Sequence, residues 1–178
     1  MKRGKSAGHD GVTAEMLKNM GASGAEMFTE LLNKAWVEKQ IPDDWKIGII
    51  IPIHKKGDSL DCNNYRGITL LSIPSKVYER ILDKKLRQHI EKDLDKAQSG
   101  FRKGHSIQDH IFTIKQLIQK SRTKNTELSL AFLDLEKAFD SVPRNVIWES
   151  LEKRGVNTHL KECIKSMFEQ NTFFIRKD

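Results

Sequence analysis

The chain of 178 residues contains only two cysteines and four prolines, and aromatic residues make up 7% of it. Cys62 and Cys163 are far apart and isolated in the sequence, so we expect two reduced thiols and no disulfide. None of the six histidines is spaced from a cysteine as zinc ligands are. These scarcities argue against a disulfide-stabilised secreted domain and against a zinc domain.

Long apolar segments are also missing. No apolar run reaches the roughly 20 residues that a bilayer-spanning helix needs, and the N-terminal MKRGKSAGHD contains no apolar signal core. We therefore expect an intracellular protein that does not associate with membranes. The sequence does not distinguish the nucleus from the cytoplasm, and it leaves the oligomeric state open.

Positive charge is in excess, with a formal net charge of +7. Segment 80–124 contains twelve Lys and Arg against five Asp and Glu, and this segment alone accounts for the excess. Such a segment suits a polyanion, because binding releases counterions from phosphates. Solvated helix faces are the commoner explanation of a charge run, so charge by itself does not decide between them.

Hydrophobic periodicity predicts a mixed α+β fold. Gly21 to Gly24 is expected to interrupt the first two helices, and Pro52 suggests an edge or a bulge in the first strand. The expected helices lie at 13–20, 25–41, 73–90, 106–118, 144–154 and 158–170, and the expected strands at 46–53, 66–71, 128–133 and from 172 onward. We expect Thr13, Ser72 and Ser106 to cap their helices, and we expect the isoleucines of 106–118 to face inward.

The segment LSLAFLDLEKAFDSVPR, residues 128–144, is the most informative part of the chain. Its apolar first half predicts a strand buried on both faces, ending at Asp134 and followed by a helical turn at 136–139. A carboxylate at the end of a rigid strand can bind Mg²⁺, which prefers oxygen ligands. An ordinary buried strand that ends in an acid explains the pattern as well. The nearest further carboxylates, Glu136 and Asp140, are better explained as a solvated residue and a turn cap.

A second group of charged residues surrounds a predicted hairpin. Lys55 and Lys56 lie in the loop between the strands at 46–53 and 66–71, and Arg66 begins the return strand. Cations on a projecting loop together with an arginine on a strand can hold a triphosphate.

Four segments, in order, resemble motifs of the reverse transcriptases of non-LTR (LINE-type) retrotransposons. FLDLEKAFD at 132–140 resembles the first catalytic motif, and WKIGIIIPIHKKGD followed by YRGITLL, residues 45–71, resembles the fingers motif. GHDGVTAEMLKNM at 8–20 is similar to the N-terminal extension motif, and QSGFRKGHSIQDHI at 98–111 is similar to the connector motif. Because the four follow one another in the family's order, the resemblance covers most of the chain.

The resemblance assigns roles to individual residues. It implies that Asp134 is a catalytic metal ligand, that the Leu135 carbonyl faces the second metal, and that Phe139 excludes a ribose 2′-hydroxyl and so selects deoxynucleotides. Phe139 packing against its own helix is the simpler alternative.

In the fingers motif, the resemblance makes Arg66 the nucleotide-contacting arginine, with Lys55 and Lys56 as phosphate or template contacts. Gly67 departs from the proline that is common at this position in the family. Arg102 and Lys103 of the connector motif are expected to reach nucleic acid, although a structural salt bridge is an equally good explanation for Arg102.

The implied fold is a partial right-hand polymerase: helix-rich fingers at 1–95, and the start of the palm, with its first strand, at 96–178. The family's second catalytic motif is a pair of adjacent aspartates, but the only such pair here, Asp43-Asp44, precedes the fingers strand. Because the two-metal mechanism needs carboxylates on both sides of the metals, the palm is incomplete in this sequence.

The resemblance therefore implies an RNA-directed DNA polymerase (nucleotidyltransferase) fragment. The intact enzyme would use two Mg²⁺ ions, an RNA template, a DNA primer and deoxynucleoside triphosphates. We expect the 178-residue chain to be inactive alone. Two alternatives stay open: a non-catalytic remnant that binds nucleic acid or a protein partner, and an element fragment without a selected function that exposes apolar surface and aggregates.

Overall fold

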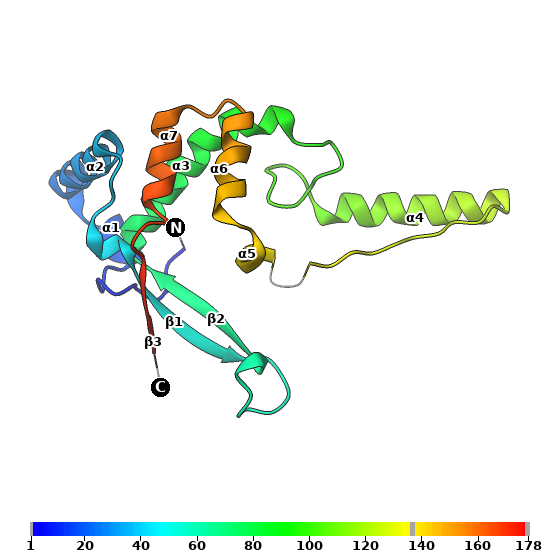
Figure 1. Ribbon diagram of the computed structural model, residues 1–178, viewed down its shortest axis with the longest axis horizontal. Helices are drawn as coiled ribbons and strands as arrows, with labels where there is room; N and C mark the ends of the chain where they lie inside the picture. The colour runs from blue at the N-terminus through cyan, green and yellow to red at the C-terminus, as the bar shows by residue number, and fades with distance from the viewer. Residues whose placement is uncertain (1, 136–137, 177–178) are drawn as a thin grey trace. The chain divides into compact units, whose positions relative to one another are not determined.

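The computed structural model of the chain describes residues 2–135 and 138–176 (Figure 1). The chain forms two compact units. The first, which we call the sheet unit, combines the chain up to His89 with the chain from Leu151 onward, and the second, the α4 unit, comprises 90–150. The boundary expected between 1–95 and 96–178 divides the chain by function. The division by contacts does not test it, so that boundary stays a prediction.

A three-stranded sheet organises the first unit, with the strand order β2-β1-β3. The strands are β1 (Ile47–His54), β2 (Tyr65–Leu71) and β3 (Thr172–Ile175). β1 pairs antiparallel with β2, as the hairpin prediction required, and parallel with β3. Pro52 lies beyond Ile50, the last residue that β3 pairs with, so its missing N–H falls where β1 has only one neighbour.

Helices of the sheet unit begin at the residues that the sequence suggested in most cases. They are α1 (Ala14–Lys18), α2 (Gly21–Glu38), α3 (Ile73–Ile90) and α7 (Thr158–Ser166), with a 3₁₀ turn η1 (Asp43–Lys46). Most of α6 (Arg144–Lys153) belongs to the α4 unit, and only its last residues, from Leu151, belong to the sheet unit. The Thr13 hydroxyl accepts a hydrogen bond from Met16 N at 3.2 Å, and the Ser72 hydroxyl accepts one from Ser75 N at 3.3 Å. Both therefore cap their helices as predicted.

The interruption predicted at Gly21 to Gly24 is confirmed only in part. α1 ends at Lys18, and Gly21, with φ +72°, begins α2, whereas Gly24 lies inside the first turn of α2. A single glycine costs a helix only about 1 kcal/mol, which the remaining residues of this 18-residue helix can offset. α7 also ends at Ser166, earlier than the predicted 170.

Most of the buried side chains come from α3, α7 and the segments that pack against them. Leu160 and Tyr78 are 1% exposed, and Cys163 is fully buried. The rings of Trp45 and Tyr78 lie 5.9 Å apart, and burial raises the pKa of the Tyr78 hydroxyl. Cys62 is exposed, and both cysteines are free thiols.

The α4 unit contains a 3₁₀ turn η3 (Glu91–Asp93), α4 (Ile107–Lys124) and α5 (Ala138–Ser141). Ser106 caps α4 as predicted, and Asp109 completes a capping box by accepting from the Ser106 N–H at 3.1 Å. The isoleucines of α4 that were expected to face inward are not buried. Ile107 is 72% exposed and Ile111 is 48% exposed, and Ile114 and Ile118 are half-buried.

The strand predicted at 128–133 is absent: residues 126–135 have no regular secondary structure and form an extended connection from α4 toward α5 (Figure 1). Phe132 is 79% exposed and Leu133 is 95% exposed, so the expected burial on both faces is wrong as well. A strand forms when a neighbour shares its backbone hydrogen bonds, and no strand in the described part of the chain lies beside this segment. Of the predicted helical turn at 136–139, residues 136 and 137 lie outside the described residues.

Within the described ranges, no helix combines the length and the apolar character that crossing a membrane would require.

Candidate active-site motifs

The loop of the β1–β2 hairpin is held by hydrogen bonds from the residues that close it. Lys55 N donates to the Asn64 carbonyl at 2.8 Å, and Asn64 Nδ2 donates to the Asp58 carbonyl at 2.9 Å. Gly57, with φ +90°, lies against the Asn64 side chain, where an added Cβ would come within 2.8 Å of Nδ2. A side chain at position 57 would therefore disturb this loop.

Three further contacts fix the same loop. The Tyr65 hydroxyl donates to the Ser59 carbonyl at 2.9 Å, and the Tyr65 ring lies 5.2 Å from the His54 ring. The Asp58 carboxylate accepts from Leu60 N at 2.9 Å. Sequence reasoning missed Asn64 and Tyr65 as supports of the loop, although the polar run CNNY after a glycine turn was a signal for such bonds.

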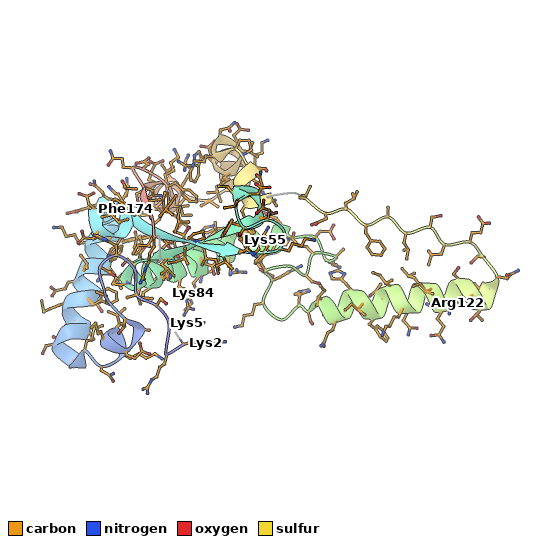
Figure 2. The ribbon with its side chains drawn as sticks, turned by 90° about the horizontal axis from the view of Figure 1, so that it is seen from below. Lys2, Lys5, Lys55, Lys84, Arg122 and Phe174 are labelled. Carbon is orange, nitrogen blue, oxygen red and sulfur yellow. The ribbon has the colours of Figure 1, made fainter. Side chains whose placement is uncertain are left out.

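The three cations assigned to nucleotide binding lie at or beside this loop. Arg66 is opposite Ile53 in the β1–β2 register, and Lys55 directly follows the last residue of β1. Because side chains alternate along a strand, Lys55 and Arg66 share one face of the hairpin. Lys55, which is labelled in Figure 2, Lys56 and Arg66 are all exposed. The hairpin thus presents cations that an anion can reach.

The first catalytic motif is exposed in the α4 unit. Asp134 and Leu135 lie at the end of the irregular segment, and Leu135 is 78% exposed. Phe139 lies in α5 and is 84% exposed, with its ring edge-on to that of Phe101 at a centroid distance of 6.1 Å. Phe101 has φ +58°. This contact between the connector motif and the catalytic motif was not predicted, because nothing in the sequence pairs two aromatic residues so far apart.

The ligand set for a divalent metal is incomplete. A carboxylate such as that of Asp134 is a suitable ligand for Mg²⁺. Yet the described residues contain no group of three His, Cys, Asp or Glu side chains that could hold a metal ion. Glu136 and the side chain of Asp140 lie outside the described part of the structure. The described residues therefore do not form a metal site, and we derive no reaction step through one.

Arg102 forms the structural salt bridge that was one of its two predicted roles. Its Nε lies 2.7 Å from Glu91 Oε1, and its guanidinium also donates to the Asp95 carbonyl at 2.9 Å. The Arg102 side chain is only 13% exposed, whereas Lys103 is exposed. Nucleic-acid contact by Arg102 and Lys103 stays a prediction.

Each unit thus holds a part of the expected site. The sheet unit brings Lys55 and Arg66 together on one hairpin face, and the α4 unit holds Asp134 and brings Phe139 against Phe101.

Comparison with known families agrees with the resemblance found in the sequence. Residues 53–177 match the family described as reverse transcriptase (RNA-dependent DNA polymerase). The match covers more than half of the chain, and the chain belongs to this family.

The chain is similar to proteins of transposons and retrotransposable elements. The chain is 29% identical to a probable RNA-directed DNA polymerase from transposon BS of Drosophila melanogaster, over 97% of the chain and 19% of that protein. It is 29% identical to the transposon TX1 uncharacterized 149 kDa protein of Xenopus laevis, over 94% of the chain and 13% of the relative. It is 27% identical to a Pol polyprotein from the type-1 retrotransposable element R2 of Popillia japonica, over 76% and 19% respectively. The chain therefore spans less than a fifth of the length of these relatives.

Proposed function

We propose that this chain is the nucleotide-binding part of an intracellular RNA-directed DNA polymerase. In this proposal the β1–β2 hairpin binds the triphosphate of an incoming deoxynucleotide. The observation that carries the proposal is the placement of Lys55 and Arg66 on one face of an ordered hairpin inside a chain of the reverse transcriptase family. In right-hand terms, 1–95 would be the N-terminal extension and fingers, and 96–178 the start of the palm.

Each residue has a specific task in this proposal. Arg66 contacts two phosphate oxygens through its planar guanidinium, and Lys55 and Lys56 neutralise further phosphate or template charge. Phe139 occupies the space that a ribose 2′-hydroxyl would need. Asp134 supplies one carboxylate to a divalent-metal site, for which Mg²⁺ is the proposed ion. A metal ion held there would supply charge stabilisation in the complete enzyme, which would join a primer 3′-hydroxyl to the α-phosphate under the direction of an RNA template, with pyrophosphate as the leaving group.

The 178-residue chain alone should not polymerise. Mg²⁺ keeps its waters and binds weakly to a single carboxylate, and the described residues provide no cluster of acids around Asp134. Binding of a nucleotide by the hairpin does not depend on that cluster, so the two properties can be tested separately.

The experiment is a titration of the chain with a deoxynucleoside triphosphate, followed by NMR of the hairpin amides. Arg66→Gln should weaken binding about tenfold or more, as expected for the loss of a charge-assisted bidentate contact worth roughly 1.5–3 kcal/mol. Lys34→Gln, at an exposed cation in α2 that pairs with Glu38, is the matched control and should leave binding unchanged.

Equal affinity for the Arg66→Gln and unaltered chains would refute the nucleotide-binding role. Primer extension by the same preparation should be absent. Extension that depends on Mg²⁺ and disappears in Asp134→Asn would show that the inactivity of the isolated chain is wrong.

A non-catalytic role in binding nucleic acid is the second candidate. It is favoured by the exposed cations of the chain together with the missing carboxylate cluster in the described ranges. Retention of RNA without any response of the hairpin to a nucleotide would support it over the first proposal.

A further inference from the structure

The residue that follows Arg66 in β2 is a glycine, at the position where the family commonly has proline. Gly67 therefore carries a backbone N–H that a proline at this position lacks. Gly67 is exposed, and it lies opposite Pro52 in the β1–β2 register. The direction of its N–H decides whether a ligand can use this donor.

That direction follows from the hydrogen-bond ladder of the hairpin. In an antiparallel pair of strands, opposed residues alternate between pairs that exchange hydrogen bonds and pairs that do not. Lys55 N donates to the Asn64 carbonyl at 2.8 Å, so these two residues form a hydrogen-bonded pair. Pro52 and Gly67 are opposed three positions farther along the ladder, and they therefore form a pair without hydrogen bonds.

The hydrogen bonds on the other side of β1 agree with this assignment. Ile50 is two residues from Pro52, so its backbone groups face the same side of the strand. The Ile50 carbonyl accepts from Arg176 N at 3.0 Å, on the side of β1 where β3 lies. The opposed residues of β2 point the other way. The Gly67 N–H accordingly faces the outer side of β2, where the described ranges contain no further strand.

Gly67 supplies the outward donor that lies nearest to Arg66 in β2. The N–H on the other side of Arg66 belongs to Tyr65, and it donates to the Cys62 carbonyl at the end of the 3₁₀ turn η2 (Cys62–Asn64). Thr69 has the next outward N–H, two residues farther along the strand. One backbone donor is thus adjacent to Arg66 and belongs to the same ordered strand.

We propose that the Gly67 N–H donates a hydrogen bond to a phosphate oxygen of the polyphosphate that Arg66 holds. Arg66 is exposed on an edge strand, so its guanidinium and the neighbouring N–H can reach one anion together. A backbone donor binds without loss of side-chain entropy, and a hydrogen bond to a charged acceptor is stronger than one between neutral groups. The inference rests on the proposed function for its ligand, but it concerns a backbone group that the proposed function does not invoke.

The test compares two substitutions at position 67. Gly67→Pro removes the N–H, and an edge strand tolerates proline where the N–H faces outward. Gly67→Ala keeps the N–H and adds a Cβ as proline does, at 3.2 Å from Ile50 Cγ2. Titration of the 178-residue chain with deoxyadenosine triphosphate should give an affinity for Gly67→Pro that is about tenfold lower than for Gly67→Ala, as expected for the loss of a hydrogen bond to a charged group.

Thr69→Pro is the matched control for the effect of a proline on this strand. It removes the next outward N–H at an exposed position of the same edge, and it should leave the affinity nearly unchanged. Inorganic tripolyphosphate serves as a second ligand. Because the proposed contact is to phosphate, Gly67→Pro should weaken its binding by a similar factor. In the unaltered chain, NMR should show a shift of the Gly67 amide resonance on addition of either ligand.

Equal affinities of Gly67→Pro and Gly67→Ala would overturn the inference, and so would an equally large loss in Thr69→Pro. A loss with the nucleotide but not with tripolyphosphate would show that the N–H contacts the sugar or the base, which also contradicts it. An unperturbed Gly67 amide would contradict it without any variant. The proposed function fails on a different result, namely an unchanged affinity in Arg66→Gln, whereas the ratio between the two variants at position 67 decides this inference. A chain that binds neither ligand would refute both.

Discussion

The two units of this chain differ in how completely their residues are packed. Every fully buried residue of the described structure belongs to the sheet unit, where Leu160, Tyr78 and Cys163 are almost inaccessible. In the α4 unit, apolar residues such as Leu133 and Phe139 face solvent. Packing fixes side-chain positions through many weak contacts, so geometry in the sheet unit is determined by the chain itself.

The residues that best identify the family are therefore not the residues that packing holds in place. Asp134 is the most distinctive residue of the sequence, yet it lies on an exposed segment without regular structure. Arg66 is less distinctive, but a register of seven paired positions and an ordered loop hold its strand. A motif can therefore reveal ancestry in a region where the chain does not build the corresponding site.

The largest expected effect is on the core of the sheet unit. Leu160→Ala should lower the free energy of unfolding by about 3 kcal/mol, within a range of roughly 2–5, because it leaves a cavity under α7. Leu133→Ala, at a residue that is 95% exposed in the α4 unit, should change it by less than about 0.5 kcal/mol. Urea denaturation followed by circular dichroism measures both, and similar losses would show that the α4 unit has a core after all.

A smaller effect is expected from a pair of glycines. Gly8→Ala places a Cβ 2.6 Å from Ser72 N, against backbone that cannot move freely. We expect a loss of about 1–3 kcal/mol, typical of overpacking.

Gly100→Ala is the control in the α4 unit, where no atom lies within 4 Å of the added Cβ. It should be neutral or stabilising by up to about 1 kcal/mol, because alanine restricts the unfolded chain. The same denaturation assay applies, and a tolerated Gly8→Ala would mean that the N-terminal segment is not fixed on the junction of β2 and α3.

What the sequence could predict depends on how far apart in the chain the interacting residues lie. Local signals were sufficient for the β1–β2 hairpin and for the caps at Thr13, Ser72 and Ser106, because each depends on residues close in the chain. The strand at 128–133 was predicted from an apolar run, but its formation depends on partners distant in sequence. The parallel pairing of β3 with β1, between Ile47 and Thr172, was likewise beyond local patterns.

The smallest expected effect concerns a charge that the sheet unit partly buries, the Glu79 carboxylate in α3. Burial raises the pKa of Glu79 above its ordinary value of 4.5, while the charge of Lys76 acts in the opposite direction. The folded state therefore binds the proton more tightly than the unfolded state, and the ionised carboxylate costs stability at neutral pH.

Glu79→Gln should raise the melting temperature slightly at pH 7. The gain should shrink as the pH falls through the raised pKa, and it should vanish below about pH 4.5, where the wild-type carboxyl group is protonated in both the folded and the unfolded state. A loss of stability at pH 7 would instead mean that the attraction to Lys76 outweighs the cost of burying the Glu79 carboxylate.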